Sequence, residues 1–420
     1  MDINGGNYQL VTNEYRQQAL FDADTGQQVS QWWDNINPFW LIRRYSDYYI
    51  AEKLIRGQAI FHINNPTKPV SLWWDKIYTS GLIEGISDYY VAKNQNQQYA
   101  IFHKDDPANP ISQWWDYIYD DGLVLKESEY YVTQNQTNQK AIFHKDNPDT
   151  PISQRWNMIH FWGLIRGESE YYIVANQSYQ YTIFHKDNPD TPISQWWEEI
   201  YEHGLVQGQS EYYIAKDYNQ KYTIFHKDYP YDPIGNWHYY IYPFGLINNT
   251  SELYAAIPTR DNHSPIQIYY YNDMQQPLYE MRKVNKNLLF YFTDTFALYL
   301  TKQYIMRYDA ITEKRDIVGI LPKDIDIQRM LYKAYNNKSW DNTSNIITNQ
   351  LISQYINYNF IPLVFQDTTS TLCYLFNTNG DYIGKFNDVK DLKQYMQQYI
   401  QQETSRYQNN NTSCDIIRLY

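Results

Sequence analysis

The sequence predicts a mainly β fold, in which a tandem array of 41-residue repeats fills residues 1–257 and a small α+β domain follows at 258–420. Three observations predict this fold. Phe-His and Tyr-Tyr pairs return at a fixed step of 41 residues, each copy alternates β-prone runs with turn residues, and the step fades after about residue 257. A fixed period of this size indicates stacked supersecondary units.

Three columns of residues carry the period. Phe-His begins at Phe61, Phe102, Phe143, Phe184 and Phe225, Gly-Leu at Gly81, Gly122, Gly163, Gly204 and Gly245, and Tyr-Tyr at Tyr48, Tyr89, Tyr130, Tyr171 and Tyr212. An earlier copy with Phe21, Trp32 and Trp33 brings the number to six. A unit of this length has the size of a propeller blade, so six copies either close into a ring or stack as an open array.

Within one copy the sequence predicts three strands and a tight corner. "YYIAKDYNQKYTIFHKD", residues 212–228, reads as a hairpin with a polar turn at 217–220, and "NPDTPISQ", residues 188–195, has the residues of a loop. The stretch "SQWWDYIYDDGL" also fits a short helix with Ser112 as N-cap and Gly122 just past its end. Pro38 and Pro243 occupy equivalent positions in other copies and limit that helix to one turn.

Two stretches resemble a known family. "FDADTGQQVSQWWDNINPFWLI" and "NWHYYIYPFGLI" resemble the bacterial WG-containing repeat, which typically has an aliphatic-Asp turn with Gly, a Val-Ile-Pro step, then Tyr-Asp, Ile, Pro-Phe and Gly-Leu. The matching positions here are Leu20, Phe21, Asp22, Trp33, Asp34, Ile36, Pro38, Phe39, Gly245 and Leu246.

The resemblance covers residues 7–257 and departs from the family in three ways. The copies are longer, His62 to His226 replace the aspartate of the turn, and Trp replaces the usual Tyr. Most members of that family are uncharacterised, so the resemblance implies architecture and little about function.

After the array the pattern changes. Residues 266–281 read as a decayed seventh copy, and 323–337 and 342–358 show the three- and four-residue apolar spacing of amphipathic helices. "STLCYLFNTNGDYIGKF" predicts a hairpin that turns at Asn379-Gly380, and a last helix is predicted over 387–402 with Asn387 as N-cap.

Charge and composition exclude several partner classes. The formal charge of −12 argues against nucleic acid and against anionic membranes as partners. The first residues lack the pattern of a signal peptide, no run of apolar residues is long enough to span a bilayer, and only Cys373 and Cys414 are present. We therefore expect a cytoplasmic protein in a reducing compartment, without a cofactor.

The repeated His-Lys-Asp triplet reads as a structural strand end. Consecutive strand residues cannot all point to one face, and a catalytic site requires one preorganised constellation, whereas this triplet recurs from His103 to Asp228. A ladder from His62 to His226 predicts no metal site, because the ring nitrogens of neighbouring copies would have to meet at one ion. The chain contains no P-loop, GxGxxG, HExxH, GxSxG or CxxC motif.

The paired tryptophans are the candidate binding residues. The second Trp of each pair occupies the core Tyr position of the WG repeat, and we predict that it is core. The first falls where that family has a polar residue, and in the fourth copy an arginine replaces it, so we expect this row to be at least half exposed. The predicted binding row is Trp32, Trp73, Trp114, Arg155, Trp196 and Trp237. The competing interpretation is that each first Trp packs on the neighbouring repeat and is covered.

Three functions are compatible with these features. The leading hypothesis is a non-enzymatic repeat scaffold that binds a partner protein through a repeated aromatic surface, and we favour a protein over a glycan because the chain is expected to stay inside the cell. The alternative is an enzyme or toxin-like effector with its site in 258–420, where His263, Cys373 and Cys414 are available. A further alternative is an acidic inhibitor or immunity-type protein that covers a basic partner.

Overall fold

The computed structural model describes residues 7–261, 264–272, 276–282, 284, 289–301, 304–321, 343–367 and 370–410. The chain folds into two compact units, Met1–Gly208 and Gln209–Tyr420. This division falls inside the predicted array, so a domain boundary at residue 257 stays a prediction. Within both units antiparallel hairpins follow one another along the chain, and the fold is mainly β with tandem repeats, as the sequence predicts.

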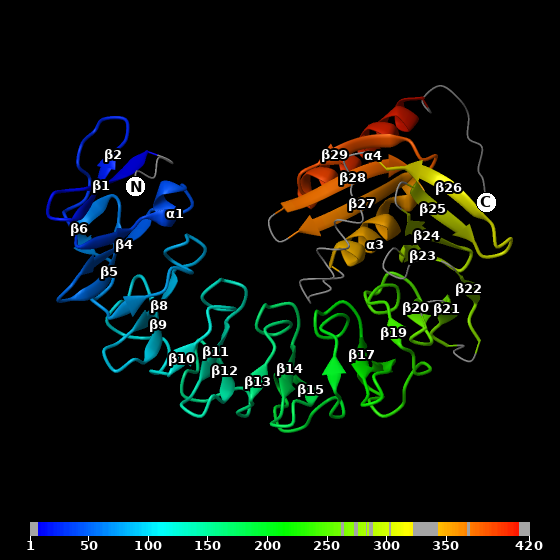
Figure 1. The fold of residues 1–420 in the computed structure, drawn as a ribbon, viewed down its shortest axis with the longest axis horizontal. Coiled ribbons are helices and arrows are strands. Elements are labelled where there is room, and N and C mark those ends of the chain that lie inside the picture. Colours follow the sequence, from blue (N-terminus) through cyan, green and yellow to red (C-terminus); the bar gives the residue numbers. More distant parts are fainter. Residues whose placement is uncertain are drawn as a thin grey trace. The chain divides into compact units, whose positions relative to one another are not determined.

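An antiparallel hairpin forms the centre of every copy (Figure 1). In the first unit the hairpins are β1 (Tyr8–Thr12) with β2 (Gln18–Asp22), β4 (Tyr48–Lys53) with β5 (Gly57–His62), β8 (Tyr89–Lys93) with β9 (Tyr99–His103), β11 (Tyr130–Gln134) with β12 (Lys140–His144), and β14 (Tyr171–Ala175) with β15 (Tyr181–His185). The second unit begins with β17 (Tyr212–Lys216) and β18 (Tyr222–His226).

A short strand follows the tryptophan positions of each copy in the first unit, and the short strands of the first four copies join the hairpin of the next copy. The short strands are β3 (Asn35–Asn37), β7 (Lys76–Ile77), β10 (Tyr117–Ile118) and β13 (Met158–Ile159), and β16 (Glu199–Ile200) is the last strand of the first unit. β7 pairs with β8, β10 with β11 and β13 with β14, so each sheet combines residues of two consecutive copies. The first copy adds α1 (Phe39–Ile42), which begins directly after Pro38, and the second copy adds the edge strand β6 (Asn65–Pro69).

The alternative of a short helix after Ser112 is wrong. The Ser112 hydroxyl accepts a hydrogen bond from the Ile101 N–H at 3.0 Å and donates to the Gln113 carbonyl at 2.9 Å. Since the hydroxyl is occupied by the neighbouring strand, it does not cap a helix, and the chain continues into β10.

A stacked pair of aromatic rings fills the core of the second to the sixth copy. The second tyrosine of the first strand faces the phenylalanine of the second strand in register, and both are buried. The ring centroids are 5.5 to 5.8 Å apart in Tyr49–Phe61, Tyr90–Phe102, Tyr131–Phe143, Tyr172–Phe184 and Tyr213–Phe225. Cross-strand aromatic pairs stabilise a hairpin beyond the area that they bury, so the Tyr-Tyr and Phe-His columns hold the fold.

Serine hydroxyls link neighbouring copies. Ser87 Oγ donates to the Val124 carbonyl at 2.6 Å, and Ser128 Oγ donates to the Ile165 carbonyl at 2.6 Å. Each link joins residues 37 positions apart. A buried carbonyl of one copy is thereby satisfied by the preceding copy, which fixes the stacking distance.

The hairpin geometry continues in the second unit beyond residue 257. One sheet contains β19 (Tyr240–Ile241), β20 (Leu253–Ile257), β21 (Ile266–Tyr270) and β22 (Tyr279–Met281), and Tyr254 stacks on Tyr269 at 5.1 Å. The next contains β23 (Leu289–Phe292), β24 (Phe296–Leu300), β25 (Tyr304–Asp309) and β26 (Arg315–Ile320).

The turn after β25 copies the turn after β2. In both, an aspartate carboxylate accepts hydrogen bonds from the N–H and the hydroxyl of a threonine three residues later, at 2.8 and 2.8 Å for Asp309 and at 2.8 and 2.9 Å for Asp22. The structural repeat therefore extends further along the chain than the 41-residue sequence period.

The C-terminal part of the second unit is α+β, as predicted. It contains α3 (Thr343–Tyr355), the 3₁₀ turn η2 (Ile356–Tyr358), the sheet β27 (Phe360–Asp367), β28 (Ser370–Asn377) and β29 (Tyr382–Phe386), and α4 (Val389–Asn410). The helix predicted from 342 and the hairpin at Asn379-Gly380 are confirmed. The helix predicted over 323–337 lies outside the described residues.

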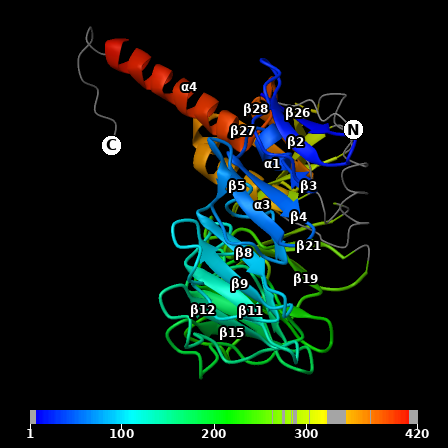
Figure 2. The ribbon, with the colours of Figure 1, turned by 90° about the vertical axis from the view of Figure 1, so that its left-hand side faces the viewer.

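Helix α4 packs on this sheet through its first turns. Leu392 and Met396 are buried with Cys373 and Leu375 of β28, and Figure 2 shows the start of α4 next to β28. The N-cap is Asp388 and not Asn387, because the Asp388 carboxylate accepts the Asp391 N–H at 2.7 Å. No helix among the described residues is long and apolar enough to cross a membrane.

Candidate binding surfaces

The first tryptophan of each pair lies half-buried between neighbouring copies. The Trp114 ring lies 5.5 Å from the Trp74 ring of the preceding copy and 5.9 Å from Phe102. The same contact joins Trp73 to Trp33 and Trp196 to Trp156. The half-buried members of the row are Trp32, Trp73, Trp114, Trp196 and Trp237. They are more covered than predicted, because each ring with such a contact lies against the tryptophan of the copy before it.

Arg155 is the exposed member of this row. Its guanidinium carbon lies 5.1 Å from the centre of the Trp115 ring, in the fourth copy, where the other copies place a tryptophan. A planar cation over an indole face is a favourable contact. The arginine at this position suggested from sequence that the row is exposed. In the structure, Arg155 replaces the ring–ring contact of the other copies with a cation–π contact.

The second tryptophan row packs against the core aromatic pair of the following copy. Trp33 is 3% exposed and lies 4.9 Å from Phe61, and Trp74 lies 4.9 Å from Phe102. In the last copy His238 takes this position, is buried, and has a pKa lowered to about 4 by burial and by Lys221. The predicted core role is confirmed for Trp33, whereas Trp74, Trp115, Trp156 and Trp197 are half-buried like the first row.

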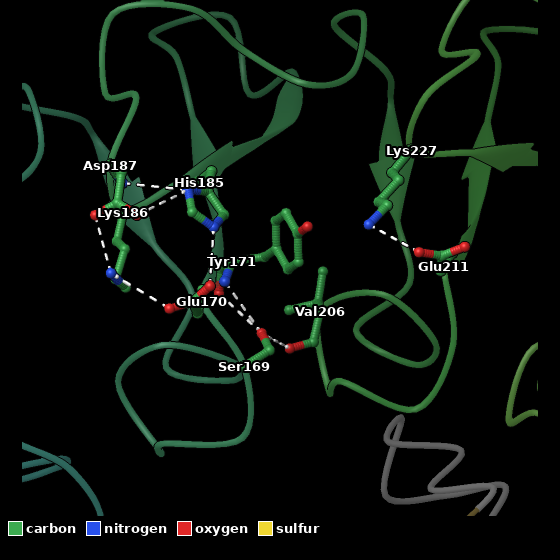
Figure 3. A network of polar contacts seen from close by, with 9 residues as sticks. All are labelled: Ser169, Glu170, Tyr171, His185, Lys186, Asp187, Val206, Glu211 and Lys227. Carbon is green, nitrogen blue, oxygen red and sulfur yellow. Dashed lines mark hydrogen bonds and ion pairs between the residues drawn. The ribbon is translucent and has the colours of Figure 1, made fainter.

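A polar network of Glu, His and Lys closes the open end of three hairpins, β11–β12, β14–β15 and β17–β18 (Figure 3). Glu170 accepts from His185 Nε2 at 3.2 Å and pairs with Lys186 Nζ at 3.3 Å. His185 Nδ1 accepts the backbone N–H of Asp187 at 3.3 Å, so Nε2 carries the proton that is donated to Glu170. The same network forms at Glu129, His144 and Lys145. The strand-end role predicted for His-Lys-Asp is confirmed.

Glu170, His185 and Asp187 also have the spacing of a metal site. One ligand atom from each residue lies within 4.8 Å of the others. However, the Lys186 ammonium lies 3.3 Å from Glu170 and 2.9 Å from Asp187, and the two carboxylates approach opposite nitrogens of the ring. The cluster already contains its own cation, which favours an ion-pair network over a metal site.

Acid is expected to weaken this network. The pKa of Glu129 is held below its usual range by Lys145 first and by His144 second. A carboxyl whose folded pKa is lowered contributes stability that is present above its ordinary pKa, near about 4.3, and is lost as the pH falls through the lowered value. We expect Lys145→Met to raise the pKa of Glu129 in an NMR titration, while the pKa of Glu170 in the next copy stays lowered. An unchanged Glu129 pKa would contradict the network.

A second aromatic row runs across three copies of the first unit and was not predicted. It consists of Tyr78, Tyr99, Tyr117, Tyr119 and Phe161, all half-buried, and is named the Tyr78–Phe161 row below. Successive ring centroids are 5.4 Å apart for Tyr78–Tyr99, 5.7 Å for Tyr99–Tyr117, 4.9 Å for Tyr117–Tyr119 and 5.0 Å for Tyr119–Phe161. The signal was present in the alternation around the buried Ile118, which places Tyr117 and Tyr119 on the same face of the chain.

The C-terminal candidates for catalysis gain no support. Cys373 is buried inside β28, and burial followed by Asp388 and Asp391 raises its pKa to about 11. The nucleophilic thiolate is therefore scarce at neutral pH. His263 and Cys414 lie outside the described residues.

No family model matches this chain, and no curated protein matches it. Among solved structures, the chain is similar to a eukaryotic initiation factor, with 7% identity, 92% of this chain and 87% of that chain covered, and a TM-score of 0.33. It is similar to BamB from Moraxella catarrhalis, with 8% identity, 74% and 87% covered, and a TM-score of 0.31. It is also similar to Hsv2p from Kluyveromyces lactis, with 9% identity, 73% of this chain and 90% of that chain covered, and a TM-score of 0.27. At such low scores these likenesses carry no argument about what the chain binds.

Proposed function

We propose that this chain is a non-enzymatic repeat scaffold, related to the WG-containing repeats, that binds a partner protein through its aromatic surface. The observation that carries the proposal is the half-buried first-tryptophan row, which repeats one partly accessible ring at almost every copy. Large, rigid aromatic faces provide much of the binding energy at protein interfaces. The turn at Asp22, with Gly26 at φ +67°, supports the resemblance to WG repeats.

Repetition also favours binding over catalysis. The His-Lys-Asp triplets, which contain the most reactive side chains of the array, are engaged in ion pairs of their own copy. An array that presents the same group several times suits an extended ligand. A glycan that stacks on the tryptophans is the alternative ligand for the same row.

The test is capture of a partner by the full chain and by variants of the row. We expect Trp73→Ala with Trp114→Ala to lose the partner, while Arg155→Ala, which removes an exposed side chain and its contact with the Trp115 ring, lowers the melting temperature only slightly. The partner is identified by mass spectrometry, and the melting temperature of each variant is measured alongside.

Trp33→Ala serves as the core control, because Trp33 is 3% exposed, with an expected loss of about 3 kcal/mol or more. If Trp73→Ala and Trp114→Ala each lower the melting temperature as far as Trp33→Ala, the row is core and the binding proposal fails. It fails equally if both variants still capture the partner.

A specific observation favours the further alternative of an acidic protein that covers a basic partner. Residues 1–208 contain 26 acidic and 15 basic residues and so carry −11 of the total formal charge of −12. The charge is therefore concentrated in the first unit, where it favours a positively charged partner.

A further inference from the structure

The Tyr78–Phe161 row forms a continuous aromatic strip. Its five rings come from three successive copies and contact one another in series, from Tyr78 to Phe161. Each of these residues is half-buried, so packing restrains its side chain while part of its surface remains accessible. Rigid aromatic faces of this kind bind a ligand at a low cost in conformational entropy.

Two rings of this strip already receive cations of the chain itself. The Lys93 ammonium lies 5.5 Å from the centre of the Tyr99 ring, and the Lys140 ammonium lies 5.9 Å from the centre of the Tyr119 ring. Both distances fall within the range of a cation–π contact. The strip therefore has the geometry to receive lysine or arginine side chains on its ring faces.

Two carboxylates flank the tyrosines of the strip along the chain. Asp116 precedes Tyr117, and Asp120 follows Tyr119. The pKa of Glu84 is raised by burial first and by the charge of Asp120 second, so two carboxylates of neighbouring copies repel each other here. A positive ligand relieves this repulsion, whereas a phosphate backbone or an anionic membrane surface increases it.

We propose that the Tyr78–Phe161 row is the docking surface for a lysine- or arginine-rich segment of the partner protein. The basic side chains lie over the tyrosine rings and pair with Asp116 and Asp120. The inference rests on the proposed function in taking the array as the binding element, and it adds both the place of contact and the chemistry of the partner. The charge of −11 in the first unit attracts such a segment and speeds its encounter.

The test is direct binding of a labelled oligo-arginine peptide to the full chain, measured by fluorescence anisotropy at low and at physiological salt. A glutamine peptide of equal length is the neutral probe. We expect the oligo-arginine peptide to bind and the glutamine peptide not to bind. Tyr117→Leu and Tyr119→Leu are each expected to weaken binding about three- to tenfold, since each removes a cation–π contact and keeps an apolar side chain.

Tyr119→Phe is the matched ring control. It removes the hydroxyl that donates to Gln134 at 2.9 Å but retains the ring face, so its affinity is expected to stay within about twofold of the natural chain. Thermal melts of every variant establish that it is folded. If Tyr119→Phe weakens binding as much as Tyr119→Leu, the ring face is not the contact and the proposal is overturned.

Two double variants that remove equal charge separate local contacts with the strip from attraction by the net negative charge of the first unit. Asp116→Asn with Asp120→Asn removes two charges beside the strip, and Asp105→Asn with Asp146→Asn removes two exposed charges beside His103 and His144. We expect the first pair to weaken binding more. Equal losses in both pairs, together with silent tyrosine variants, would show attraction by net charge alone and overturn the docking surface.

The two proposals fail in different ways. If the full chain captures its partner through the tryptophan row but does not bind oligo-arginine, the docking surface is refuted and the scaffold function stands. If oligo-arginine binds at the tyrosine strip while the tryptophan variants still capture the partner, the tryptophan row is refuted and the docking surface stands.

Discussion

Replacing Gly163 with alanine is expected to destabilise the first unit by about 3 kcal/mol or more, since a clash with backbone adds to the strain of a left-handed residue. Gly163 has φ +75°, and an added Cβ would lie 2.3 Å from the Tyr171 carbonyl oxygen and 2.7 Å from the Val206 carbonyl oxygen. Both atoms are backbone and cannot rotate away. We expect the melting temperature to fall by about 10 °C in differential scanning calorimetry.

Gly26→Ala is the matched control for this prediction. Gly26 has φ +67°, close to that of Gly163, but an added Cβ would meet nothing within 4 Å. Its cost is therefore limited to the left-handed backbone, about 1 to 2 kcal/mol. Equal losses in the two variants would mean that positive φ alone explains the Gly-Leu column and that the copies do not approach closely at Gly163.

The same close approach explains why the sequence period predicts the fold so well. Tyr-Tyr, Phe-His and Gly-Leu are the positions at which a copy contacts itself or its neighbour, as Tyr131 contacts Phe143 and the Leu164 N–H donates to the Tyr171 carbonyl at 2.8 Å. A residue held by such contacts recurs at the full step, so the columns visible in the sequence are the packing positions.

Two local predictions failed for different reasons. Ser112 precedes a run that fits a helix, but its hydroxyl accepts the N–H of Ile101 from a neighbouring strand. Asn387 is the predicted N-cap of the last helix, but the carboxylate of the adjacent Asp388 accepts the Asp391 N–H. Tertiary contacts decide the first case, and the second is a difference of one residue that sequence alone rarely separates.

The tyrosine strip illustrates what a period cannot show. Tyr78 and Tyr119 belong to one column, but the fourth copy places His160 there, and the strip continues through the adjacent Phe161. The rings meet only because the short strand of one copy joins the hairpin of the next. A surface that is assembled from different columns of neighbouring copies leaves no simple repeat in the sequence.

Replacing Tyr131 with alanine is the second change with a large expected effect, a loss of about 3 to 5 kcal/mol in urea unfolding. Tyr131 is fully buried and stacks on Phe143 at 5.7 Å, with the ring planes 16° apart. Truncation removes the stack and leaves a cavity between two strands that no neighbouring side chain can fill without moving the backbone.

Tyr131→Phe separates the ring from its hydroxyl. The hydroxyl is buried without a hydrogen-bond partner among the described residues, and burial raises its pKa. Because a buried polar group without a partner costs free energy, its removal is expected to leave stability unchanged or to raise it by up to about 1 kcal/mol. A loss comparable to that of Tyr131→Ala would instead show that the hydroxyl forms a hydrogen bond, for example with the Trp115 Nε1–H, which is also buried. That hydrogen bond, and not the ring stack alone, would then explain why tyrosine recurs in this column.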